Sequence, residues 1–227
     1  MAELMANLSV KALVEQTLTS GDIDDRWSGR STALEGIRGH QRLQSQRGEG
    51  YEAERTVCAT AYCSVAADQV MQIDAAENAP GRRVTVHLKG RVDGVYPASD
   101  PLGVEEIKTL RGDPAALPES HLKLHWGQLR IYAHLLLREI DVDVTNLRMC
   151  YLDLDTEREH VFEAAATRQE LDQFFADTLS RYCRMLANRA QWWAFRDRTL
   201  DSPFPHGDFR RGQRALAATA WRTATAG

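Results

Sequence analysis

Two neighbouring segments of this 227-residue chain alternate apolar and polar residues, with a short run of turn-forming residues between them. The first segment, Gly90–Tyr96, carries Asp93, and the second, Val104–Thr109, carries Glu106 and Lys108. Because side chains of a strand alternate between two faces, Glu106 and Lys108 point the same way. A hairpin through the intervening residues brings Asp93 beside them. The sequence therefore predicts two carboxylates and one ammonium on a single face of a sheet.

This charge arrangement predicts a site for a divalent cation. Two hard oxygen ligands suit Mg²⁺ or Mn²⁺, and a metal together with a lysine can orient and deprotonate a water beside a phosphodiester. Glu105 is the alternative carboxylate, because a slip of one residue in the strand register would exchange the two faces. A surface hairpin whose charged residues face solvent is the structural alternative.

A long helix is predicted over Glu119–Ile140, directly after Pro118. Proline suits a helix start, and a negative charge in the first turn suits the helix dipole. One stripe of this helix carries the polar and aromatic residues His121, His125, Gln128 and Tyr132. Such a stripe on a leucine-rich helix requires a polar surface to face, although solvent remains the alternative for His121 and His125.

These elements, in this order, resemble the RecB-like branch of the PD-(D/E)XK nuclease superfamily. That branch carries a Gln-x-x-x-Tyr element on the helix after the catalytic hairpin, and Gln128–Ala133 is similar to it. It also places a metal-binding His on an N-terminal helix, which Leu34–Gln41 resembles, with His40 as the candidate. The resemblance covers roughly residues 9 to 200.

The resemblance implies a metal-dependent DNA nuclease that hydrolyses phosphodiester bonds. Asp93 and Glu106 would hold Mg²⁺ or Mn²⁺, with His40 as a third ligand. The main-chain carbonyl of Ile107 would be a fourth ligand.

It also implies roles for three further catalytic residues. Lys108 would orient or deprotonate the attacking water, and Gln128 and Tyr132 would position the DNA backbone or support Lys108. Two functions of other classes stay open. One is a non-catalytic DNA-binding module of the same fold that feeds or recruits a helicase, and the other is a scaffold domain that recruits repair partners.

The predicted order of elements is helices, strands, helix, strands, helix. Helices are expected at 9–20, about 31–45, 119–140 and after the capping box at 167–170, and strands at 53–65, 83–96, 104–110, 146–153 and 158–164. This order predicts an α/β (α+β) fold, which the resemblance identifies as a restriction-endonuclease-like mixed central sheet flanked by helices.

Composition limits the other classes of protein. A hydrophobic content of 43% supports a substantial core. The chain has no apolar run long enough for a membrane span and no signal-peptide pattern at its start, so a cytoplasmic protein is expected. The four cysteines, Cys58, Cys63, Cys150 and Cys183, have no Cys-x-x-Cys spacing. Some RecB-like relatives hold an iron–sulfur cluster on a tight C-terminal cysteine group, which this chain lacks, so buried thiols and no iron–sulfur cluster are predicted.

The net charge of −4 does not indicate a DNA-binding protein, but its distribution is uneven. Residues 181–214 contain eight arginines and three aspartates, with Trp192, Trp193 and Phe195 interleaved. Arginines with aromatic rings can hold phosphates and stack on bases. The alternative is a solvated helix face whose aromatic side chains turn to the core.

The C-terminal segment suggests a division of the chain into a nuclease domain, residues 1–202, and a tail, residues 203–227. Within the tail, Phe209–Leu216 resembles the segment just before the phosphate-binding loop of XPD-like, superfamily 2 DNA helicases. The tail would then be the truncated start of a helicase domain, whereas the alternative is an ordinary basic, alanine-rich helix. The expected partners are single-stranded or branched DNA rather than intact duplex, and a helicase domain in cis or in trans, in DNA repair or processing.

Overall fold

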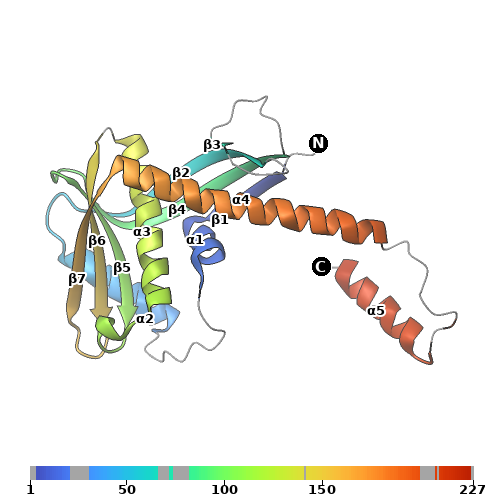
Figure 1. The fold of residues 1–227 in the computed structure, drawn as a ribbon. Coiled ribbons are helices and arrows are strands. Elements are labelled where there is room, and N and C mark those ends of the chain that lie inside the picture. Colours follow the sequence, from blue (N-terminus) through green and yellow to red (C-terminus); the bar gives the residue numbers. More distant parts are fainter. Residues whose placement is uncertain are drawn as a thin grey trace. The chain divides into compact units, whose positions relative to one another are not determined.

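A seven-stranded mixed sheet forms the centre of the computed structural model (Figure 1). Its strands are β1 Leu4–Ser9, β2 Glu52–Val65, β3 Gln72–Ile73, β4 Arg82–Tyr96, β5 Leu102–Leu110, β6 Val144–Asp153 and β7 Glu159–Thr167. The order is β3-β2-β4-β5-β6-β7, with β1 paired to β4. The β1–β4 and β5–β6 pairs are parallel, and the other pairs are antiparallel. The structure describes residues 4–20, 31–65, 72–73, 82–140, 142–199, 208 and 210–225.

The helices of the described residues are α1 Val10–Leu18, α2 Ala33–Gln46, the short 3₁₀ helix η1 Pro114–Ala116, α3 Glu119–Glu139, α4 Arg168–Thr199 and α5 Gln213–Thr225. Their starts follow local rules. Ser9 caps α1 by accepting a hydrogen bond from the amide of Ala12 at 3.0 Å. Thr32 and Glu35 form a capping box at α2. The chain divides into two compact units, Met1–Ala187 and Asn188–Gly227.

In the first unit, helices cover both faces of the sheet. The large apolar core includes Leu13 of α1, Leu129 of α3 and Leu179 of α4. A smaller cluster joins Leu43 of α2 to Ile107 of β5. Figure 1 shows α2 and α3 on opposite sides of β5 and β6. The mixed sheet flanked by helices confirms the predicted fold class.

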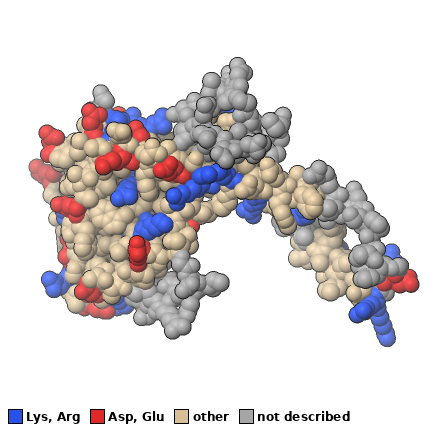
Figure 2. Space-filling model, in the orientation of Figure 1, with Lys and Arg blue, Asp and Glu red and all other residues tan. Residues whose placement is uncertain are grey.

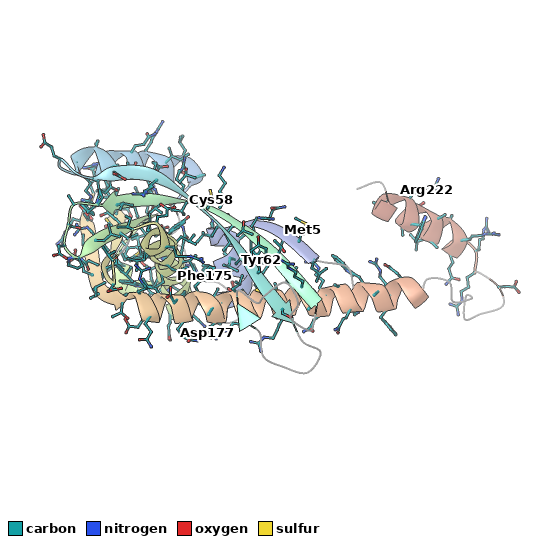
Figure 3. All side chains as sticks on the ribbon, turned by 90° about the horizontal axis from the view of Figure 1, so that it is seen from above. Met5, Cys58, Tyr62, Phe175, Asp177 and Arg222 are labelled. Carbon is teal, nitrogen blue, oxygen red and sulfur yellow. The ribbon has the colours of Figure 1, made fainter. Side chains whose placement is uncertain are left out.

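Helix α4 shows how one element separates its core side from its solvent side. Phe175 is buried in the core and Asp177 is exposed, and the two side chains leave the helix in different directions (Figure 3). At the start of α4, Glu170 Oε2 accepts a hydrogen bond from the amide of Thr167 at 2.8 Å. The predicted capping box is therefore present.

The other predicted helices and strands are also confirmed, with small differences at their ends. β1 and β3 were not predicted. Helix α4 ends at Thr199, before the tail that was predicted to begin at residue 203. None of the described helices combines the length and the apolar character needed to cross a bilayer.

The cysteines lie in different surroundings. Cys63, Cys150 and Cys183 are buried as predicted, whereas Cys58 is exposed, so the prediction of a buried thiol was wrong for Cys58. Cys58 and Cys63 of β2 thus point to opposite faces, as their odd spacing predicts. Cys63 Sγ lies 2.9 Å from Cys183 Sγ of α4. The absence of an iron–sulfur cluster stays a prediction.

Candidate active site

Strands β4 and β5 separate at Asp93, and this opening defines the site. They pair only over the last residues of β4, from Gly94 opposite Glu105 to Tyr96 opposite Gly103. Beyond that point, Asp93 Oδ2 accepts the main-chain N–H of Ile107 at 2.7 Å. The carboxylate thus replaces a ladder partner and is held against β5.

Glu106 and Lys108 project from β5 on the side of α3, as strand alternation predicts. Lys108 Nζ donates to Glu106 Oε1, and the lysine side chain is 23% exposed whereas that of Glu106 is 2% exposed. Glu106 Oε2 is buried and has no hydrogen-bond partner among the described residues. Buried carboxylate oxygens are normally paired, so this one is open to a further partner, such as a water or a cation.

The charges of this pair depend on burial. Burial raises the pKa of the Glu106 carboxyl from 4.5 to about 7, although the neighbouring Lys108 ammonium opposes the shift. Burial alone lowers the pKa of Lys108, but the carboxylates of Glu106 and Asp93 outweigh it and raise that pKa overall. A carboxyl whose charged form is disfavoured in this way gains from a cation placed beside it.

Helix α2 supplies His40 to the same place. His40 Nδ1 lies 3.4 Å from Asp93 Oδ1. Burial lowers the pKa of His40, but the hydrogen bond and the charge of Asp93 raise it overall. The structure therefore brings together His40, Asp93, Glu106 and Lys108, which are spread over 69 positions from 40 to 108.

Gln128 and Tyr132 of α3 extend the site behind the lysine. Lys108 Nζ donates to Gln128 Oε1 at 3.2 Å. Tyr132 is 4% exposed. Burial raises its pKa, while hydrogen bonds with Gln128 and with the backbone of Arg91 oppose this shift. The stripe of α3 also faces protein at His125, whose Nδ1 lies 3.0 Å from the Tyr151 hydroxyl.

One residue near the site was not predicted. Glu54 of β2 lies opposite Asp93, between the pairs Ala53–Gly94 and Arg55–Val92. Its φ of 60° is in the left-handed region, which side chains other than Gly rarely adopt. Carboxylate oxygens of Glu54 and Asp93 and a ring nitrogen of His40 all lie within 4.8 Å of one another.

Glu105, the alternative carboxylate, is excluded from the site by the observed register. It points to the face of α2, is 0% exposed, and forms ion pairs with Arg47 and Arg148. Glu106 therefore occupies the position on the side of Asp93.

These residues fit a divalent cation. The fit depends on the unpartnered Glu106 oxygen and on the close approach of His40, Glu54 and Asp93. Carboxylate oxygens with one imidazole nitrogen suit Mg²⁺ or Mn²⁺. No described contact involves the carbonyl of Ile107, and its role as a ligand stays a prediction.

Comparisons with known proteins identify the superfamily of the chain. The sequence profile of the PD-(D/E)XK nuclease superfamily matches residues 6–201. Among solved structures, that of SSO0001 is similar with a TM-score of 0.43 and 19% identity, over 77% of this chain and 75% of that chain. An alkaline exonuclease (LHK-Exo) from Laribacter hongkongensis is similar with a TM-score of 0.31 and 9% identity, over 82% of this chain and 94% of that chain. No curated protein sequence matches the chain. Because the profile match spans most of its length, the chain belongs to the PD-(D/E)XK nuclease superfamily.

Proposed function

We propose that this protein is a metal-dependent DNA nuclease of the RecB-like type that hydrolyses phosphodiester bonds. The observation that carries the proposal is the buried Glu106 carboxylate, which has one oxygen on Lys108 and the other without a partner. Asp93 and His40 stand beside it, with Asp93 held by the amide of Ile107.

His40, Asp93 and Glu106 are the proposed metal ligands, with the carbonyl of Ile107 as a fourth. Glu54 joins them as a further candidate, because its unusual backbone conformation accompanies a carboxylate close to His40 and Asp93. When bound, Mg²⁺ or Mn²⁺ would supply positive charge that neutralises the scissile phosphate.

Lys108 is proposed to orient or deprotonate the attacking water from its position between Glu106 and Gln128. The Nζ ammonium donates a hydrogen bond to each of these two oxygens, so the lysine is held at a defined point beside the carboxylates. Tyr132 is too buried to contact DNA directly, which favours a role in supporting Gln128 and Lys108.

Single-stranded or branched DNA is the proposed substrate, in repair or processing with a helicase in cis or in trans. On the face shown in Figure 2, acidic and basic side chains are interspersed over the first unit. The C-terminal part of α4 differs, because Trp192 and Phe195 are 59% and 58% exposed and the Arg189 guanidinium lies 4.8 Å from the Trp193 ring centre. Exposed rings with arginines suit unpaired bases and their phosphates.

The test is cleavage of labelled single- and double-stranded DNA with Mn²⁺, Mg²⁺ or EDTA. We expect EDTA to abolish cleavage by the wild type. We expect Asp93→Asn and Glu106→Gln to lose nearly all cleavage and to bind Mn²⁺ more weakly in calorimetry, because each removes a ligand charge without changing shape. Asp177→Asn, on the exposed side of α4, is the control for a lost carboxylate.

Thermal melting should show that the variants remain folded. If either site variant cuts as fast as the wild type, the assignment of the site is wrong. If the wild type binds DNA with each metal but never cuts it, the non-catalytic binding module is the better description.

A further inference from the structure

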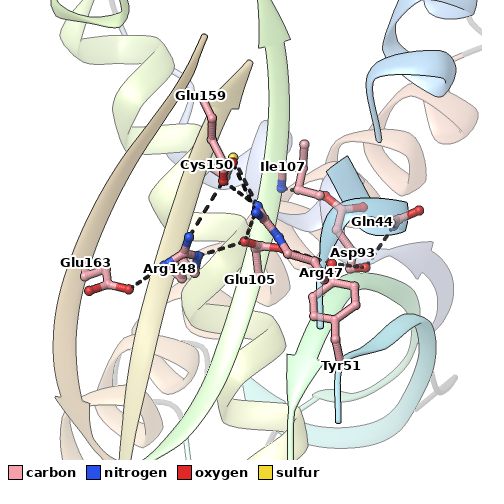
Figure 4. Close-up of polar contacts among 10 residues, drawn as sticks. All are labelled: Gln44, Arg47, Tyr51, Asp93, Glu105, Ile107, Arg148, Cys150, Glu159 and Glu163. Atoms are coloured by element: carbon pink, nitrogen blue, oxygen red, sulfur yellow. Dashed lines mark hydrogen bonds and ion pairs between the residues drawn. The ribbon is translucent and has the colours of Figure 1, made fainter. Parts of the chain in front are cut away.

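Both carboxylate oxygens of Glu105 accept hydrogen bonds, although the side chain lies on the face away from the proposed metal site (Figure 4). Its Oε1 accepts from Arg47 Nη2 at 2.8 Å and from Arg148 Nε at 2.9 Å. Its Oε2 accepts from Arg47 Nε at 3.2 Å and from the Tyr51 hydroxyl at 2.9 Å. A fully buried carboxylate needs such partners, so this network is a built part of the fold.

Tyr51 connects this carboxylate to the backbone of Asp93. Its hydroxyl donates its one proton in a bifurcated hydrogen bond to Glu105 Oε2 at 2.9 Å and to the main-chain oxygen of Asp93 at 3.2 Å. The ring crosses β4 at Gly94, where an added Cβ would lie only 2.0 Å from the Tyr51 oxygen. The bare backbone at this position is what lets the tyrosine reach both partners. Burial and the charge of Glu105 raise the pKa of Tyr51, which keeps the hydroxyl a donor.

Arg47 connects Glu105 to helix α2. It is the C-terminal cap residue of that helix, and its Nη1 also donates to Glu159 of β7 at 3.1 Å. One turn earlier, Gln44 Nε2 donates to the main-chain oxygen of Asp93 at 2.9 Å. His40 precedes Gln44 by four residues and so lies on the same side of α2. The end of α2 is therefore tied both to Glu105 and to Asp93.

We propose that Glu105 is a positioning residue for the metal site. Through Tyr51 it holds the backbone of Asp93, and through Arg47 it holds α2, so that it sets the separation of Asp93 and His40. This inference depends on the proposed function, because it concerns the same cation.

The test is Mn²⁺ affinity measured by titration calorimetry, without DNA, together with thermal melting. We expect Tyr51→Phe and Glu105→Gln to bind Mn²⁺ about ten-fold to a hundred-fold more weakly, the usual range when a group that orients a metal ligand is removed. If Glu105→Gln does not fold, the Mn²⁺ affinity of Tyr51→Phe is sufficient to test the proposal. This variant keeps the aromatic ring, and Glu105 keeps its contacts with Arg47 and Arg148.

Arg148→Gln is the matched control. Arg148 contacts Glu105 as directly as Arg47 does, but its other described contacts go to Glu159 and Glu163 of β7 and not to α2 or Asp93. We expect this variant to melt at a lower temperature while its Mn²⁺ affinity stays within a few-fold of the wild type. A loss of affinity equal to that of Tyr51→Phe would show that the network acts through stability alone and would overturn the proposal.

Asp93→Asn distinguishes a failure of the positioning role from a failure of the metal site. If it abolishes Mn²⁺ binding while Tyr51→Phe binds as the wild type does, Glu105 has no positioning role and the nuclease site stands. If Asp93→Asn itself binds Mn²⁺ as the wild type does, the proposed metal site is wrong and the positioning role falls with it.

Discussion

Lys108 has contacts that suit a role in the chemical step more than in metal binding. Its ammonium donates hydrogen bonds to Glu106 and Gln128, whereas Asp93 and His40 contact each other. We expect Lys108→Ala to bind Mn²⁺ within a few-fold of the wild type. Its cleavage rate should fall by at least ~10²-fold, the scale of a positioned acid–base group.

Single-turnover cleavage and calorimetry on the same preparations measure the two effects separately. Lys89→Ala removes an exposed lysine of β4 and is the control for a change of net charge. A rate for Lys108→Ala close to that of the wild type would mean that the residue is an ordinary surface charge.

Local rules were sufficient to predict some residues of the site and not others. Strand alternation places Glu106 and Lys108 on one face, and helical spacing places Gln128 and Tyr132 on one stripe. Glu54 could not be predicted, because its approach to Asp93 accompanies a left-handed backbone conformation that no sequence pattern indicates. The roles of all these residues stay predictions.

At the scale of elements, α3 packs on β4 at a point where β4 has no side chain. A Cβ added to Gly90 would lie 2.4 Å from Cε1 of Tyr132 and 3.0 Å from Cγ2 of Val10. Because both neighbours are buried, neither can move away freely. We expect Gly90→Ala to reduce the free energy of unfolding in urea by about 1–3 kcal/mol, the usual cost of overpacking.

Gly48→Ala is the matched control, since nothing lies within 4 Å of the added Cβ and the same entropy is removed from the unfolded chain. It should leave the stability unchanged or raise it slightly, by up to about 1 kcal/mol. Equal effects of the two substitutions would contradict the tight packing of α3 on β4.

Elements with strong local signals were predicted, and the two shortest strands, β1 and β3, were not. Ser9 and the capping box at Thr167 mark helix starts within a few residues of sequence. β1 is a short strand whose first pair joins Leu4 to Val84, so its partner is 80 positions away. A segment of six residues with such a partner gives too little pattern to identify a strand.

At the scale of the whole molecule, the described part of the C-terminal helix α5 lies outside the core. The described side chains of α5 from Gln213 to Thr223 are exposed. We expect deletion of residues 203–227 to leave cleavage and the melting temperature nearly unchanged, because few buried contacts are lost. A large drop in the melting temperature would show that this segment is integral to the nuclease unit, and the helicase resemblance would then be a coincidence.

Strand β5 is buried on both faces, which has a consequence for how the chain avoids misfolded states. Where both faces are apolar, hydrophobicity cannot distinguish the native pairing from one displaced by a single residue. Displacement in one direction would place Val104 instead of Glu105 opposite Arg47 and Arg148, and displacement in either direction would turn Lys108 to the other face, away from Gln128. Each displacement leaves a buried charge without its partner, at a cost of about 3–5 kcal/mol. The charged residues of β5 thus create an energy gap against mispaired sheets that no apolar residue could provide.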